Sequence, residues 1–141
     1  MFKDIMLCVD MQDETSMAKA FDTSVEMCRN TGATLHILSV VPDVGFPVVG
    51  QYLDEDIEEK IINEAKKQLD DLVHKTVPDD IKSRHIVAQG SIYGQIVGMS
   101  NKVGADLIIL TAHRPELKDY LLGPNAARVV RHANCSVMVI R

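Results

Sequence analysis

Strict alternation between two kinds of apolar pattern is the feature that most constrains how this chain can fold. Short, continuous apolar runs predict strands buried on both faces, and they alternate with stretches whose apolar residues recur at helical spacing. The apolar runs are residues 5–9, 35–41, 85–88, 107–110 and 137–140. Five strands separated by helices predict an α/β fold with a doubly wound parallel sheet.

The helical stretches are bounded by residues that usually end helices. Apolar stripes cover residues 17–28, 57–72 and 92–103. Each is followed by a glycine, which accepts the left-handed C-cap conformation, or by a proline, which cannot continue a helix. A fourth helix is expected to open at Gly123 and to lead into the last strand.

Composition limits the classes of protein to which the chain can belong. With 141 residues, 46% of them hydrophobic, it is predicted to form one domain over residues 1–141. A net charge of -5 without a basic stripe argues against nucleic-acid binding. No apolar run approaches the roughly 18 residues of a membrane span, and no signal peptide is recognisable. Cys8, Cys28 and Cys135 have no CxxC spacing, so we expect buried thiols and a cytoplasmic location.

The carboxyl ends of the strands form the expected binding edge. With the common strand order 3-2-1-4-5, Asp10, Val40, Gly90 and Thr111 align along one edge. Ligands of such sheets bind where the strand order reverses, here between the first and fourth strands, so Asp10 faces the loop 111–114. The Asp10 carboxylate could accept hydrogen bonds from a ribose diol, or it could cap the following turn.

Gly123 stands directly before the last expected helix. A glycine there permits close approach of the backbone to a phosphate, although a plain tight turn would also explain it. The backbone amides of Asn125 and Ala126, in the first helical turn, are expected to be available to an anion.

The segment AHRPELKDYLLGPNAARVVRHANCSVMVIR, together with the first strand ending in Val9-Asp10, resembles the universal stress protein family. The likeness spans the whole chain and is greatest for a small single-domain subgroup with an AHRP…LLGPNAA loop. It implies an adenine nucleotide α-hydrolase-like sheet with helices on both faces. It also implies bound ATP, with magnesium as a possible counter-ion and no dedicated metal site.

Many family members bind ATP through a Gly-x2-Gly-x9-Gly-Ser/Thr loop, from which this chain departs. Thr111 and Arg114 stand at the first two glycine positions, Gly123 keeps the third, and Pro124 replaces the Ser or Thr. A guanidinium can contact phosphate oxygens directly, whereas proline supplies neither a hydroxyl nor an N–H. Asn125 could restore part of the lost polarity. The resemblance therefore implies a nucleotide site that is present but altered.

The same resemblance assigns further contacts. The backbone of Val40 would meet the adenine, Gly90 and the turn at 91–92 would form the far wall, and Leu110 would pack against the base or in the core. We expect Arg114 to contact ligand and His113 to be structural rather than a general acid. The complete set of expected nucleotide contacts is Cys8, Val9, Asp10, Val40, Gly90, Leu110, Thr111, Ala112, His113, Arg114, Gly123, Pro124, Asn125 and Ala126.

Three functions are compatible with these observations. The favoured one is a cytoplasmic stress-response protein that binds ATP, hydrolyses it slowly and incidentally if at all, and dimerises through the last strand at 136–141. The second is an interaction module with a disused pocket, whose partner docks on residues 46–52. The third, an α-hydrolase-type enzyme, is disfavoured because VDMQDETS at the first strand's end lacks a glycine-rich pyrophosphate loop.

Overall fold

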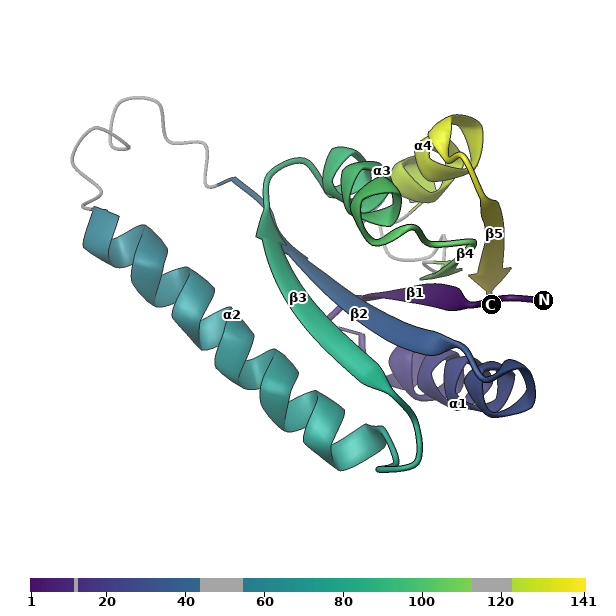
Figure 1. Ribbon diagram of the computed structural model, residues 1–141. Helices are drawn as coiled ribbons and strands as arrows, with labels where there is room; N and C mark the ends of the chain where they lie inside the picture. The colour runs from purple at the N-terminus through teal and green to yellow at the C-terminus, as the bar shows by residue number, and fades with distance from the viewer. Residues whose placement is uncertain (12, 44–54, 113–122) are drawn as a thin grey trace.

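The computed structural model describes residues 1–11, 13–43, 55–112 and 123–141. Strands and helices alternate along the chain, as the sequence pattern predicts (Figure 1). The elements are β1 (Asp4–Val9), α1 (Glu14–Thr31), β2 (Thr34–Val41), α2 (Glu55–Thr76), β3 (Ser83–Gln89), α3 (Ile92–Val103), β4 (Leu107–Thr111), α4 (Gly123–His132) and β5 (Ser136–Ile140).

The five strands form one parallel sheet in the order β3-β2-β1-β4-β5, which confirms the predicted fold class. The chain leaves β1 toward β2 and β3 and then crosses back over β1 to reach β4. The direction of winding therefore reverses between β1 and β4, at the centre of the sheet.

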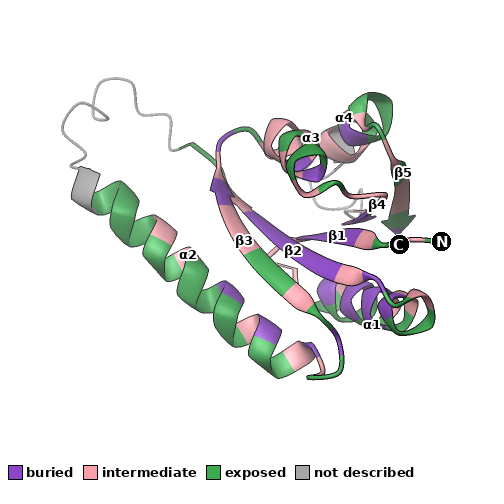
Figure 2. Ribbon diagram, viewed as in Figure 1, coloured by how far each residue is buried: buried purple, intermediate pink, exposed green. Residues whose placement is uncertain are grey.

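Side chains of the central strands alternate between two hydrophobic layers. In β1, Ile5 and Leu7 pack with residues of α1 and α2, whereas Met6 and Cys8 pack with residues of α3 and α4. Helices consequently cover both faces of the sheet, and β1 and β2 are buried along most of their length (Figure 2). This two-sided burial explains why the central strands are continuous apolar runs rather than alternating ones.

Local chemistry fixes the helix ends. The Asp13 side chain accepts a hydrogen bond from the Ser16 N–H at 3.2 Å, a typical N-cap of α1. Gly32 and Gly104 follow α1 and α3 with φ values of 74° and 70°, the left-handed conformation expected from the sequence. As predicted, α2 ends before Pro78.

The apolar stripe of α2 is buried over only half of its length. Leu69 is fully buried and Val73 nearly so, but Ile57 and Ile61 remain 40% and 38% exposed to solvent among the described residues. Figure 2 shows the described part of the first half of α2 as largely exposed. These turns lie beyond the end of the sheet, so helical periodicity there does not mark a contact with the core.

Two of the three cysteines are buried, as expected. Burial raises the pKa of the Cys28 thiol to about 11 and raises that of Cys8 still further. Cys135 is only partly buried, so that prediction was wrong for it. In the described ranges, no helix combines the length and apolarity that crossing a bilayer demands.

Candidate functional site

The carboxyl edge of the sheet opens between β1 and β4. The ladder between these strands ends at the pair Leu7 and Ile109, whereas the ladder between β1 and β2 continues to Val9 and Ser39. The last residues of β1 and β4 therefore have no ladder partner across the reversal point. This separation produces the crevice that ligands of doubly wound sheets occupy.

A cavity of about 240 Å³ lies at this edge, on the β2 side of the crevice. Its walls come from the ends of β1 and β2, from α2 and from the start of α3. The lining residues are Cys8, Val9, Asp10, Met11, Leu38, Ser39, Val40, Val41, Pro42, Ala65, Gln68, Ile92 and Ile96. A complete ligand pocket typically measures about 300–1,000 Å³, so this apolar space suits one part of a ligand rather than a whole nucleotide.

Four residues expected to contact nucleotide line the cavity: Cys8, Val9, Asp10 and Val40. Ile92, from the turn expected to form the far wall, also lines it. The neutral thiol of Cys8 adds to the apolar wall, and the Asp10 carboxylate is the acidic group at the mouth. An apolar space with a few polar groups, the Asp10 carboxylate and the Ser39 and Gln68 side chains, matches a base attached to a sugar diol.

Gly90 does not line the cavity but shapes its border. Its φ of 142° is rarely adopted by other residues, and a Cβ atom would lie 2.7 Å from Gln95 Nε2. The Gly90 N–H donates to the Val41 carbonyl at 3.0 Å. This glycine therefore ties the ends of β2 and β3 together as the chain turns into α3.

Leu110, Thr111 and Ala112 also lie outside the cavity lining. Leu110 is fully buried against α3 and α4, which corresponds to the core alternative rather than to a base contact. Thr111 is 1% exposed, and its Oγ1 has no hydrogen-bond partner within the described segments. The Ala112 N–H donates to the Ile140 carbonyl at 2.8 Å, which anchors the end of β4 to β5.

The phosphate end of the expected site is described only in part. His113 and Arg114 lie outside the described residues, as does the segment 46–52. Helix α4 begins at Gly123, followed by Pro124, and its first turn contains no acidic residue. Asn125 and Ala126 are half-buried in that turn. The helix start thus has the polarity that favours an anion, and no carboxylate lies within its first turn.

Sequence reasoning missed several cavity residues, among them Ser39, Ala65 and Gln68. Ala65 belonged to the predicted apolar stripe of α2, and its small side chain was the one available signal of a gap. Gln68, one turn further on, is a polar residue at the same wall. Both reach the cavity because α2 crosses the end of β2, which sequence alone does not reveal.

Potential metal-ligating side chains are scattered through the described parts of the chain. Within residues 1–11, 13–43, 55–112 and 123–141, no three His, Cys, Asp or Glu side chains gather closely enough to hold an ion. The cavity provides an apolar surface and one carboxylate for ligand recognition, and the start of α4 lies outside its lining.

Comparison with known proteins finds one family that matches over the whole chain. Residues 1–141 match the universal stress protein family. A similar sequence is Universal stress protein G of Escherichia coli O157:H7, which is 27% identical over 143 residues covering all of both chains.

Solved structures share the fold. The hypothetical protein MJ0577 superposes with a TM-score of 0.80 at 22% identity, over 99% of this chain and 96% of that one. The universal stress protein from Archaeoglobus fulgidus in complex with dAMP gives a TM-score of 0.67 at 20% identity, over 99% and 98% of the chains. A universal stress protein in complex with cAMP gives 0.62 at 18% identity, over 99% and 97%.

Proposed function

The chain belongs to the universal stress protein family, and on that premise we propose that it binds an adenine nucleotide, with ATP favoured, at the carboxyl edge of its sheet. The observation that carries the proposal is the apolar cavity at the carboxyl edge, lined by Asp10 and located on the β2 side of the point where β1 and β4 part. The dAMP and cAMP complexes of two proteins with the same fold support an adenine ligand.

The residues of the cavity fit the parts of such a ligand. The base would lie between the end of β2 at Val40 and the start of α3 at Ile92, where the surface is apolar. The Asp10 carboxylate would accept hydrogen bonds from the ribose hydroxyls. The phosphates would extend toward the amides of Asn125 and Ala126 at the start of α4, with magnesium as a counter-ion.

We propose a signalling or protective role rather than catalysis. The lining residues provide one carboxylate and no histidine, so a positioned acid and base pair is missing from the part of the site that is described. Hydrolysis would then be slow and incidental. Free thiols at all three cysteines are in keeping with the proposed cytoplasmic location.

Equilibrium dialysis with labelled ATP is the test of the proposed function. We expect saturable binding by the purified protein, and competition by unlabelled ADP and AMP, which keep both ribose hydroxyls, would report how far the site depends on the phosphate chain. No binding at millimolar ATP would reject an ATP function for this chain.

We further propose a homodimer formed through β5. This strand pairs with β4 on one side, and within the described chain no strand pairs with its other side. Val139 is 38% exposed and Val137 and Met138 are half-buried, so the edge is apolar as well as unpaired. Such an edge invites pairing, and a two-fold axis would cover it with its own copy.

The Val139→Lys substitution should convert a dimer into a monomer. A charge at an apolar strand edge is a common obstacle to edge-to-edge pairing. Sedimentation equilibrium should give twice the chain mass for the parent protein and the single-chain mass for the variant. Lys60→Glu on the exposed face of α2 serves as a charge control and should remain dimeric. A monomeric parent protein would contradict the proposed interface.

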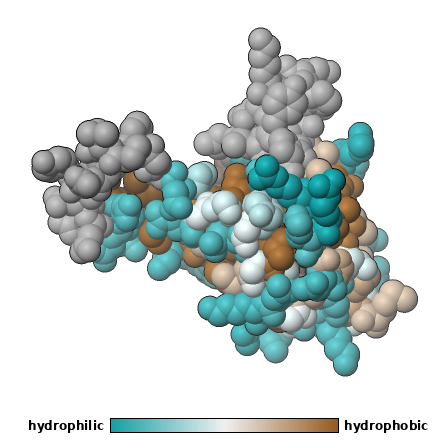
Figure 3. Space-filling model, turned by 90° about the horizontal axis from the view of Figure 1, so that it is seen from above, coloured by the Kyte–Doolittle hydropathy of each residue, from teal (hydrophilic) through white to brown (hydrophobic). Residues whose placement is uncertain are grey.

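One observation favours the alternative function, a protein-interaction module. Ile57 and Ile61 are exposed large apolar residues at the start of α2, and together with Ala65 they line a shallow hollow. The surface where α2 begins shows brown, hydrophobic atoms beside teal ones (Figure 3), and an exposed apolar patch can serve as a contact surface. Failure of ATP binding, combined with a partner whose capture is lost in Ile57→Ser/Ile61→Ser, would establish this alternative.

A further inference from the structure

Asp10, the proposed ribose acceptor, follows β1 in a turn that has open space on two sides. On one side it lines the cavity of about 240 Å³ at the carboxyl edge. On the other it lines a hollow of about 230 Å³ between α1 and α2, whose walls include Met17, Phe21 and Leu72. Packing of side chains therefore determines the position of Asp10 only in part.

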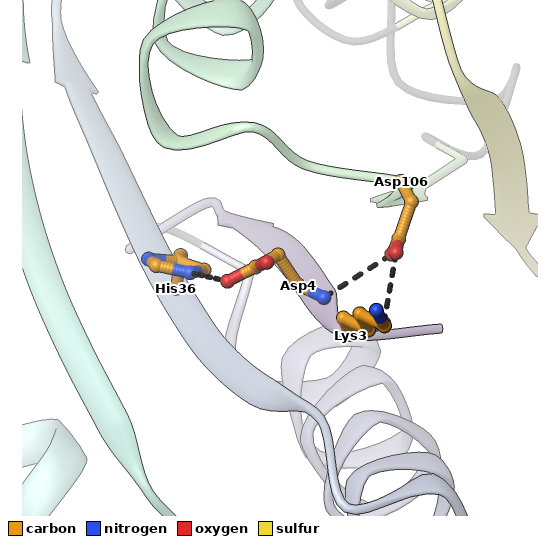
Figure 4. Close-up of polar contacts among 4 residues, drawn as sticks. All are labelled: Lys3, Asp4, His36 and Asp106. Atoms are coloured by element: carbon orange, nitrogen blue, oxygen red, sulfur yellow. Dashed lines mark hydrogen bonds and ion pairs between the residues drawn. The ribbon is translucent and has the colours of Figure 1, made fainter. Parts of the chain in front are cut away.

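The strand that leads to this turn is anchored at its opposite end. The Asp106 carboxylate accepts hydrogen bonds from the N–H groups of Lys3 and Asp4 at 2.8 and 3.2 Å. Asp4 Oδ1 lies 2.9 Å from Nε2 of the buried His36 on β2 (Figure 4). The ladder to β2 then runs without interruption from Asp4 to Val9. β1 is thus fixed along its length, and the turn after Val9 must be held by other contacts.

The first turn of α1 provides these contacts. The Asp10 N–H donates to the thioether sulfur Sδ of Met17 at 3.1 Å, and the Asp10 carbonyl accepts from the Asp13 N–H at 3.2 Å. Asp13 is the N-cap of α1: its side chain accepts from the Ser16 N–H, and its carbonyl accepts from the Met17 N–H at 3.1 Å. Met17 and Asp13 therefore connect the backbone of Asp10 to the start of the helix.

Met17 is a firm support because its own side chain is packed in the core. It is 4% exposed and belongs to the hydrophobic layer that contains Phe21 and Leu69. A role in packing alone would be fulfilled equally by leucine, which has a similar volume. Leucine offers no acceptor, however, whereas a thioether sulfur can accept a hydrogen bond. The contact to the Asp10 N–H is thus the property that distinguishes methionine at this position.

We propose that Met17 is a positioning residue of the nucleotide site, whose sulfur holds the Asp10 backbone so that the carboxylate stays at the cavity. Met17 does not line that cavity, so it acts through Asp10 rather than by touching the ligand. The effect on binding rests on the proposed nucleotide function, but the support of Asp10 is a property of the free protein and is tested there first.

Nuclear magnetic resonance of the nucleotide-free protein tests the support directly. In Met17→Leu, the Asp10 amide should shift, and its hydrogen should exchange with solvent about 2- to 12-fold faster, as expected for the loss of one ordinary hydrogen bond. Met27→Leu is the matched control, because it makes the same substitution in α1 at a partly buried methionine that lines neither hollow. An unchanged Asp10 amide in Met17→Leu would overturn the proposal, whatever the affinity for ATP.

Titrations with ATP and 2′-deoxy-ATP test whether the support matters for binding. Met17→Leu should weaken ATP binding by about 2- to 12-fold and narrow the preference for ATP over the deoxy analogue, because Asp10 would contact the ribose. General damage to packing would weaken both ligands equally and lower the stability in urea. Equal weakening of both ligands, or an unchanged ATP affinity, would reject Met17 as a positioning residue.

A double variant shows whether Met17 acts through Asp10. In an Asp10→Ala background, Met17→Leu should cause no further loss of ATP affinity, because the carboxylate that it positions is already missing. Additive losses would contradict the proposal. If the parent protein binds no ATP, the proposed function and the role of Met17 in binding both fail, while the amide measurement still decides whether Met17 holds Asp10.

Discussion

The Ile108→Ala substitution is expected to lower the free energy of unfolding by about 2–5 kcal/mol. Ile108 is fully buried in the middle of β4, where it packs with Leu38, Ile96 and Val129 in the layer beneath α3 and α4. The substitution removes three side-chain carbons and leaves a cavity. A sheet that is covered by helices on both faces can collapse very little around such a gap. Loss of several kcal/mol is a large fraction of the stability of a domain of this size.

Urea unfolding followed by circular dichroism measures this effect, at fixed protein concentration because dimerisation would add to the apparent stability. Val130→Ala is the matched control: it removes methyl groups from the neighbouring helix α4 at a side chain that is 55% exposed. Its effect should stay within about 0.5 kcal/mol. Similar losses for both variants would contradict the assignment of Ile108 to the core.

The central strands were predictable because burial on both faces of a sheet requires continuous runs of apolar residues. β1 and β4 are continuous apolar runs, and their predicted bounds differ from the observed ones by one residue at most. The edge strand β3 was predicted two residues short at its start. Ser83 and Arg84 are polar and solvent-accessible, and they belong to the strand through backbone pairing with β2, for which side chains give no signal.

The partial exposure of α2 could not be predicted, for a different reason. Helical periodicity in the residues around Ile57 and Ile61 correctly predicted a helix, but it cannot show where the sheet beneath the helix ends. Burial depends on the relative lengths of a helix and of the strands it covers. That relation is a property of the tertiary structure.

At the site, strand ends were easier to predict than side-chain directions. Asp10 and Val40 were placed at the edge by the parallel topology alone, and both line the cavity. Leu110 and Thr111 lie at the same edge, yet neither lines the cavity, and both are almost completely buried. The contributions of Ala65 and Gln68 depend on the path of a crossover helix, which local patterns do not specify.

The altered phosphate loop shows another limit of position-by-position comparison. Eight residues, 115–122, separate Arg114 from Gly123, one fewer than the x9 spacing of the family loop allows. The match of Arg114 to the second glycine therefore depends on a one-residue deletion. Its expected phosphate contact remains a prediction, as does that of Gly123, although α4 does begin at this glycine.

The Asp10→Ala substitution is expected to weaken ATP binding by about 10- to 150-fold, because hydrogen bonds to a charged group contribute about 1.5–3 kcal/mol. Asp10 follows the last residue of β1 and lines the cavity from the side of the crevice. Its carboxylate can accept from both ribose hydroxyls, whereas Asp10→Asn keeps one acceptor oxygen and should give an intermediate loss. Calorimetric titration with ATP measures all three proteins. Asp22→Ala, at an exposed carboxylate on α1, is the charge-matched control and should bind as the parent does.

A ligand with one hydroxyl fewer shows whether Asp10 acts through the ribose. If the carboxylate binds the sugar, 2′-deoxy-ATP should bind the parent protein more weakly than ATP does, while Asp10→Ala should no longer distinguish the two ligands. A general electrostatic effect of Asp10 on the phosphates predicts the reverse: removing a negative charge would strengthen binding of both ligands equally. The two explanations predict opposite changes in the ATP affinity of Asp10→Ala, so one set of titrations decides between them. An unchanged preference for ATP in Asp10→Ala would assign the sugar contact to another group at the cavity mouth.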